Sequence, residues 1–126
     1  MSSYRGGCHC GAIRYSVTGE IDELVDCNCS ICAKTAYLHW EVSPEQFSLE
    51  TDEKAITNYR FGTLTAQNYF CTTCGISPFR RSRSAPDQID INARCLEGIT
   101  LSEIPVVTFD GVHWEEQMKK GGAGYE

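Results

Sequence analysis

Hydrophobic and polar residues alternate along much of the chain, which is the period-two pattern of half-buried β-strands. The clearest case is 12–18, where Ile13, Tyr15 and Val17 fall on one face. Other short segments, rich in aromatic and β-branched residues and bounded by turn residues, predict strands at 37–42, 47–50, 55–61, 64–70, 76–81, 88–92 and 104–109. Residues 61–64 predict the turn of a hairpin. The pattern therefore predicts a mainly β protein.

Two short stretches predict helical turns. Ser43 has the character of an N-cap, with Pro44 at the first helical position and Gln46 at the third, which is a capping-box arrangement. Residues 30–35 predict a second turn. The glycine-rich segment 121–126 predicts a flexible tail, so we expect one domain over 1–120.

Charge and length narrow the class of protein. The 126 residues include 11 Lys+Arg and 17 Asp+Glu, a net charge of −6, which gives no electrostatic reason to bind nucleic acid. No apolar run approaches the ~20 residues of a membrane-spanning helix, so we expect no membrane partner. The start, MSSYRGGCHCG, lacks the apolar segment of a secretory signal. These features predict a cytoplasmic protein.

The eight cysteines are the main chemical signal. In a reducing compartment, dense cysteines indicate metal binding rather than disulfides. Seven of them fall in C-x-C and C-x-x-C spacings, which let one turn direct two thiolates at the same ion; the pairs and the triplet are Cys8 and Cys10, Cys27, Cys29 and Cys32, and Cys71 and Cys74. Such thiolate sets favour zinc.

The spacing predicts two different zinc sites. Two pairs of thiolates make a closed structural site, which we assign to Cys8, Cys10, Cys71 and Cys74. Three thiolates from one short loop leave a tetrahedral ion with one open position, the feature of a catalytic zinc; these are Cys27, Cys29 and Cys32.

Spacing alone leaves other groupings open. Cys95 would give two purely structural sites if it joined the triplet, although a single cysteine is more often a small buried hydrophobe. The first pair would also suit a site with Cys27 and Cys29. Among the histidines, we expect His39 to be a structural residue of a strand and His113 to be a surface or packing residue. His9 stands between two candidate ligands and is expected to point away from the ion.

Five basic residues, Arg5, Lys34, Arg80, Arg81 and Arg83, form the main positive group. The first interpretation is a solvated hairpin. The alternative is that some of these side chains bind substrate carboxylates, since the planar guanidinium suits bidentate pairing.

Three cysteine blocks together resemble the glutathione-dependent formaldehyde-activating enzyme family, which includes the centromere protein V type of domain. They are Gly-Cys-His-Cys-Gly at 7–11 followed by Ile-Arg-Tyr at 13–15, Cys-Asn-Cys-Ser-Ile-Cys-Ala-Lys at 27–34, and Phe-Cys-Thr-Thr-Cys-Gly at 70–75. The likeness spans roughly residues 5 to 115, by the order and spacing of the motifs.

The resemblance implies a zinc-stapled β-tent of small antiparallel sheets and the same division of ligands into four structural and three catalytic cysteines. It also implies a carbon–sulfur lyase, S-(hydroxymethyl)glutathione synthase, with a glutathione-type thiol and formaldehyde or another small aldehyde as partners. Two positions depart from the family pattern: Asn28 replaces a histidine and Ala33 an arginine. Because an amide is no general base, a non-catalytic zinc module that carries a thiol ligand or binds a protein is the alternative.

Overall fold

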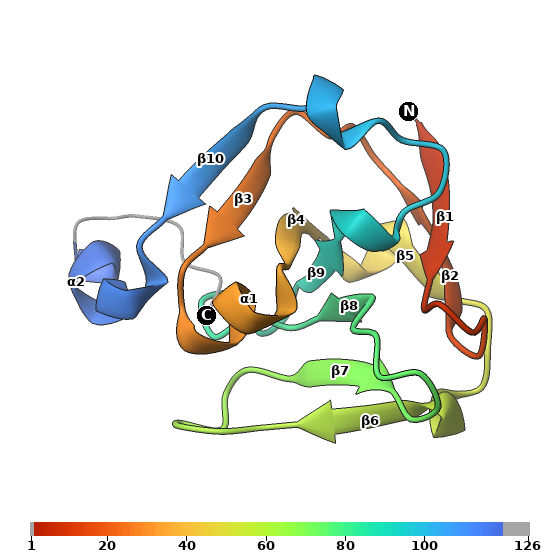
Figure 1. Cartoon of the computed structure of the whole chain (residues 1–126), viewed down its shortest axis with the longest axis horizontal. Helices are drawn as coiled ribbons and strands as arrows, with labels where there is room; N and C mark the ends of the chain where they lie inside the picture. Colours follow the sequence, from red (N-terminus) through yellow and green to blue (C-terminus); the bar gives the residue numbers. More distant parts are fainter. Residues whose placement is uncertain (1, 120–126) are drawn as a thin grey trace.

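The computed structural model describes residues 2–119 as three small β-sheets splayed like the sides of a tent (Figure 1). The strands β1 and β2 form one side, β3 and β10 slope down the other, and the hairpin β6–β7 lies along the base. The predicted mainly β class is confirmed. The segment 121–126, expected to be a flexible tail, lies outside the described residues.

The first sheet is antiparallel, in the order β1-β2-β5; its strands are β1 (Ser3–Gly7), β2 (Arg14–Thr18) and β5 (Phe47–Leu49). The predicted inward face of β2 is confirmed, because Ile13, Tyr15 and Val17 are all at most 1% exposed. The strand β1, which the hydrophobic pattern missed, brings the chain to Cys8.

The central sheet runs β10-β3-β4-β9-β8. Its strands are β3 (Leu24–Cys27), β4 (Leu38–Val42), β8 (Phe79–Arg80), β9 (Ile89–Asn92) and β10 (Val106–Phe109). All neighbours are antiparallel except β10, which pairs parallel with β3. Parallel pairing needs a long connection, and the intervening 78 positions, 28 to 105, contain the rest of this sheet. The expected strand at 76–81 is reduced to two residues.

The third sheet is the predicted hairpin, formed by β6 (Ile56–Tyr59) and β7 (Asn68–Cys71). Its strands are shorter than the expected 55–61 and 64–70. The predicted turn is present, since the Leu64 amide donates to the Phe61 carbonyl at 3.0 Å. The strand β7 ends on Cys71, so the hairpin brings one candidate ligand toward the base of β1.

The helices are short. The predicted turns are confirmed as α1 (Ser30–Thr35) and η1 (Pro44–Gln46), and the amide of Ser43 donates to Gln46 Oε1 at 2.9 Å. The remaining ones are η2 (Glu53–Ala55), η3 (Ala93–Cys95), η4 (Leu101–Glu103), η5 (Gly111–His113) and α2 (Trp114–Lys119). The sequence pattern did not predict α2. None of the described helices is long and apolar enough to cross a membrane.

Two hydrophobic clusters hold the sheets together. The larger one joins all three sheets through aromatic contacts, with Phe47 and Phe79 ring centroids 4.8 Å apart and Tyr69 and Phe79 5.2 Å apart. The smaller one consists of Val25, Phe109 and three buried cysteines. Burial of a large apolar side chain contributes about 1.5–3 kcal/mol, so the larger cluster dominates the hydrophobic stabilisation.

Candidate metal centres

Four thiols meet where β1 and the β6–β7 hairpin come together. The Sγ atoms of Cys8, Cys10, Cys71 and Cys74 all lie within 4.8 Å of one another. Two of the separations are 3.7 Å, from Cys8 to Cys10, and 3.6 Å, from Cys10 to Cys71. Four sulfurs bound tetrahedrally at ~2.3 Å from zinc would be about 3.8 Å apart. The four-thiol cluster therefore has the spacing of a closed zinc site.

Local backbone geometry sets up this cluster. Gly75 has φ 79° and its amide donates to the Cys71 carbonyl at 2.9 Å, which closes the knuckle between the last two thiols. The amides of Thr73 and Cys74 both point at Cys71 Sγ, each at 3.4 Å. Amides aimed at a sulfur favour its charged form. The knuckle is thus arranged for thiolates.

Three further thiols form a second cluster at the junction of β3 and α1. Cys27 ends β3, Cys29 is the N-cap of α1 and Cys32 lies in its first turn. Their Sγ atoms lie within 4.8 Å of one another, and the residues are only 1–2% exposed. The Cys32 amide donates to Cys29 Sγ at 3.4 Å. The structure thus groups the two sets of cysteines as the spacing predicted.

The pKa values of the three buried thiols are shifted in opposite directions. The pKa of Cys29 is lowered to about 2, first because the thiols of Cys27 and Cys32 donate to its sulfur. The pKa of Cys27 is raised to about 11 by its contact with Cys29, and that of Cys32 is raised by its contacts with both neighbours. Because a metal binds thiolates rather than thiols, binding through all three sulfurs would release protons.

A buried cation lies beside the three-thiol cluster. Arg80 is 2% exposed, and its Nη1 is 3.9 Å from Cys32 Sγ and 3.6 Å from Asp90 Oδ2. Its Nε donates to Asn68 Oδ1 at 3.1 Å, while His39 Nδ1 is 2.6 Å from the same Asp90 oxygen. The solvated-hairpin interpretation is therefore wrong for Arg80. The antiparallel register that pairs Arg80 with Asp90 is a tertiary feature with no local sequence signal.

The segment after β10 covers the three-thiol cluster from the other side. A Cβ added to Gly111 would lie 2.4 Å from Cys27 Sγ and 2.8 Å from Cys29 Cβ, so only glycine fits there. Asn28 holds this segment: its Oδ1 accepts from the Val112 amide at 3.0 Å, and its Nδ2 donates to Asp110 Oδ1 at 3.1 Å. Asn28 is thus a structural clip, a role that the sequence analysis did not foresee.

A small cavity of about 290 Å³ opens directly beside the same cluster. Cys32 and Arg80 supply part of its wall, and most of the rest is aromatic or aliphatic, including Tyr37, Tyr59 and Phe70. An apolar wall excludes water and strengthens the electrostatic interactions inside. The arrangement suits a reaction at a sulfur-bound metal.

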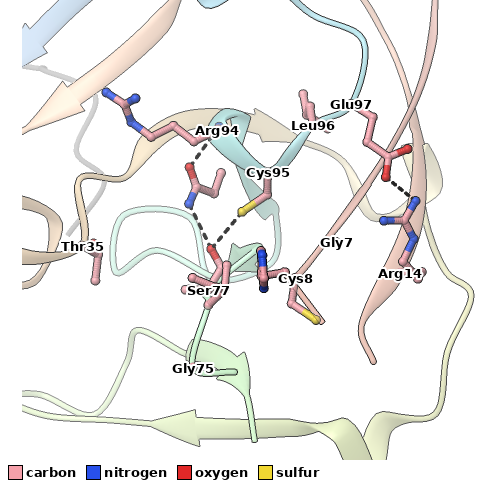
Figure 2. Close-up of a pocket in the computed structure, with 13 residues that line it drawn as sticks. Gly7, Cys8, Arg14, Thr35, Gly75, Ser77, Arg94, Cys95, Leu96 and Glu97 are labelled. Carbon is pink, nitrogen blue, oxygen red and sulfur yellow. Dashed lines mark hydrogen bonds and ion pairs between the residues drawn. The ribbon is translucent and has the colours of Figure 1, made fainter. Parts of the chain in front are cut away.

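A second, larger cavity of about 670 Å³ lies between the end of α1 and the four-thiol cluster (Figure 2). Cys95 lines it and belongs to neither thiol cluster. Its Sγ is 3.8 Å from the carbonyl oxygen of Ser77, and burial raises its pKa to about 11. Cys95 is therefore a protonated thiol, and the grouping that joined it to the triplet is not formed, nor is the one that joined the first pair to Cys27 and Cys29.

The three histidines take no part in either cluster among residues 2–119. His39 is buried against Asp90, which supports the structural interpretation. His113 is exposed, with its Nδ1 2.7 Å from Asp110 Oδ2. His9 is exposed on the turn between two thiols and lines the larger cavity.

Comparison with known proteins fits this geometry. The sequence model of a family described as glutathione-dependent formaldehyde-activating enzyme matches residues 3–107. A crystal structure of a Rhodobacter sphaeroides protein is similar, with a TM-score of 0.74 and 30% identity over 82% of this chain and 99% of that one. The chain therefore belongs to the glutathione-dependent formaldehyde-activating enzyme family.

Proposed function

We propose that the protein is a zinc-dependent carbon–sulfur lyase that joins a glutathione-type thiol to formaldehyde or another small aldehyde. The observation that carries the proposal is the set of three buried thiols, one of which, Cys32, lies on the wall of an apolar cavity, in a chain of this family. A closed site would have no position for a substrate, whereas three ligands leave a fourth position open.

The donor sets of both clusters fit zinc, which binds thiolates tetrahedrally. In the proposal, Cys8, Cys10, Cys71 and Cys74 hold a structural zinc, and Cys27, Cys29 and Cys32 hold a catalytic zinc, which need not be fully occupied. A zinc ion at the second site supplies Lewis acidity, which lowers the pKa of a thiol and polarises a carbonyl.

The chain's own residues bind and orient the reactants. The thiol loses a proton and its sulfur attacks the aldehyde carbon. One carbon–sulfur bond forms as the carbonyl π bond breaks, and the carbonyl oxygen takes up a proton to become a hydroxyl. The Arg80 cation, fixed by Asp90 and Asn68, lies where negative charge gathers near Cys32. The aromatic wall of the small cavity limits the water that competes for the carbonyl carbon.

Proton transfer needs a route other than Asn28. Its amide is no general base, and both ends of the side chain are occupied by Asp110 and Val112. We propose that the thiol proton passes to solvent, which also supplies the proton of the product hydroxyl. The same observation favours the second candidate, a zinc module that binds a thiol ligand or a protein without turnover.

The experiment is to count zinc ions per chain by native mass spectrometry under reducing conditions and to follow adduct formation from glutathione and formaldehyde. Cys29→Ser is the test variant and Cys95→Ser the matched control, because Cys95 lies outside both clusters. We expect two zinc ions and turnover in the wild type and the control. Cys29→Ser should keep one zinc and fall to the uncatalysed rate.

Unchanged turnover in Cys29→Ser would contradict the proposal. Two zinc ions in the wild type with no rate above the uncatalysed reaction would favour the binding module instead.

A further inference from the structure

The small cavity beside the three-thiol cluster is much larger than formaldehyde needs. Its volume of about 290 Å³ equals the liquid volume of roughly ten water molecules. Formaldehyde has two heavy atoms and takes the place of about one or two of these waters. An engineered cavity of ~150 Å³ is enough to bind benzene. The cavity beside Cys32 therefore has room for an aldehyde that carries a short alkyl chain or a ring.

The wall of this cavity offers few polar groups to a ligand, because its hydroxyl groups are already used within the protein. The Tyr37 hydroxyl donates to the Asp90 carbonyl oxygen at 2.7 Å, and Ser77 Oγ donates to the Tyr69 carbonyl oxygen at 2.6 Å. A charged or strongly hydrated substituent would lose its water here without a replacement, which costs free energy. The lining therefore selects an apolar substituent.

Exposure gives the cavity an inner end and a mouth. Arg80 and Cys32 are each 2% exposed and mark the inner end, whereas Tyr59 is 53% exposed and marks the mouth. Asn68 links the two ends, since its Oδ1 accepts from Arg80 Nε at 3.1 Å and its Nδ2 donates to the Tyr59 carbonyl oxygen at 2.9 Å. A carbonyl at the inner end lies beside the thiols and a cation, and its substituent extends toward Tyr59.

The ring of Tyr59 is held in place although it is half exposed. It stacks on the ring of Phe61, with the centroids 5.7 Å apart and the planes at 22°. A large aromatic side chain contributes apolar contact area to a ligand that packs against it. With Tyr37 and Phe70, it lines the path from the mouth to the thiols with aromatic rings.

We propose that the small cavity binds the substituent of the aldehyde, so that the substrates include aldehydes with an uncharged, apolar chain or ring and not formaldehyde alone. The thiol sulfur attacks the aldehyde carbon at the inner end. One carbon–sulfur bond forms as the carbonyl π bond breaks, and the oxygen takes up a proton from solvent, which receives the proton that the thiol loses. Tyr59 is the specificity-determining residue at the mouth. This inference rests on the proposed function, which supplies the thiol.

The test measures dissociation constants by calorimetry on the zinc-loaded protein, with thioethers whose S-alkyl group represents the aldehyde carbon and its substituent. S-butylglutathione has three more methylenes than S-methylglutathione, and each fully buried methylene strengthens binding about fourfold. We expect S-butylglutathione to bind at least about tenfold more tightly. S-(3-carboxypropyl)glutathione has a chain that ends in a carboxylate and should bind no more tightly than the S-methyl compound.

Tyr59→Ala is the test variant and Leu64→Ala the matched control. Both side chains are 53% exposed and belong to the same hairpin, but Leu64 does not line the cavity. The substitution keeps the Tyr59 carbonyl that Asn68 contacts. We expect the preference for S-butyl over S-methyl to fall at least about threefold in Tyr59→Ala and to remain in Leu64→Ala. The preference is a ratio, so changes in the binding of the glutathione body cancel.

Four results would overturn the inference: equal affinities of the S-methyl and S-butyl compounds, tight binding of the carboxypropyl compound, an unchanged preference in Tyr59→Ala, or no saturable binding to the wild type. Failure of the proposed function would appear separately. In that case no adduct would form from glutathione and formaldehyde, while the preference for the S-butyl compound would persist.

Discussion

The two thiol clusters of this small protein are built on opposite principles. The four-thiol cluster joins segments 61 residues apart, Cys10 and Cys71, and part of it is exposed. The three-thiol cluster comes from one six-residue stretch, 27–32, yet all its sulfurs are buried by distant parts of the chain. The four-thiol cluster is formed by two short knuckles and joins two distant segments of the chain. The three-thiol cluster is buried only because the chain folds around it, and a cavity lies beside it. We infer that metal binding stabilises the fold mainly at the four-thiol cluster.

The largest expected difference between the clusters is in the stability lost when one cysteine is removed from each. On the proposed function, Cys71→Ser is expected to abolish a structural zinc site, whose ion would contribute on the order of 10 kcal/mol of apparent binding free energy coupled to folding. Because the net stability of a domain is only ~5–15 kcal/mol, this variant should be largely unfolded at 25 °C. Cys29→Ser should remain folded with a lower melting temperature. Circular dichroism melts with and without a chelator measure both.

The matched control for these melts is Cys95→Ser, whose side chain belongs to neither cluster. If Cys29→Ser unfolds as completely as Cys71→Ser, the division into a structural and a functional cluster is wrong.

A second variant separates the clusters without touching a ligand. Gly111→Ala places a methyl group 2.4 Å from the position of Cys27 Sγ and 2.8 Å from Cys29 Cβ. Since overpacking a buried contact costs ~1–3 kcal/mol, the segment after β10 must move away from the thiols. We expect zinc to be lost from the three-thiol cluster and kept at the four-thiol cluster. Native mass spectrometry under mild chelation would count the ions.

Gly98→Ala is the control for this variant. It introduces backbone strain at φ 73° but meets no atom within 4 Å. Zinc should remain at two ions in this control, and equal loss from the two variants would show that crowding at Cys27 is not the cause.

The sequence predicted the clusters better than their surroundings, and the reason is chain distance. The thiols within each knuckle are two or three residues apart, so spacing indicated which thiols of one knuckle would meet. It left open which knuckles share a site, and the structure groups Cys8 and Cys10 with Cys71 and Cys74. The burial of Arg80 depends on its pairing with Asp90 across β8 and β9, and the role of Asn28 depends on a segment more than 80 residues away. Such contacts follow from sheet register, which hydrophobic alternation does not specify for a two-residue strand.

The fold shows the same limit. The alternation at 12–18 predicted β2 and its buried face correctly, because the whole signal lies in one strand. The parallel neighbour β10 was expected as a strand at 104–109, but its partner and direction are set by the rest of the chain. The helix α2 is short, and Trp114 at its start is held by tertiary contacts, its Nε1 donating to Ser84 Oγ at 3.0 Å.

The smallest expected effect concerns the exposed pair His113 and Asp110, which lies in the segment after β10. The hydrogen bond with Asp110 raises the pKa of His113 above 6.5, and the same bond lowers the pKa of Asp110 below 3.8. The His113 contribution to stability is complete below pH 6.5 and is lost as the pH rises through its raised pKa; that of Asp110 is complete above pH 3.8 and is lost as the pH falls through its lowered pKa. The pair therefore stabilises most between these values.

The segment after β10 covers the three-thiol cluster. Removing the imidazole charge should make the stability of this segment independent of pH between these values. For His113→Gln, the rate of zinc transfer to a chelator should exceed that of the wild type at pH 6, and the difference should shrink toward pH 8.5. The transfer rate from the four-thiol cluster should be the same in both proteins at each pH, since that cluster does not contact this segment. A difference that grows with pH would show that the imidazolium does not hold this segment. Equal changes in the zinc transfer rates of the two clusters would show that both open in one motion. That result would contradict the conclusion that the two clusters are held together by different parts of the fold.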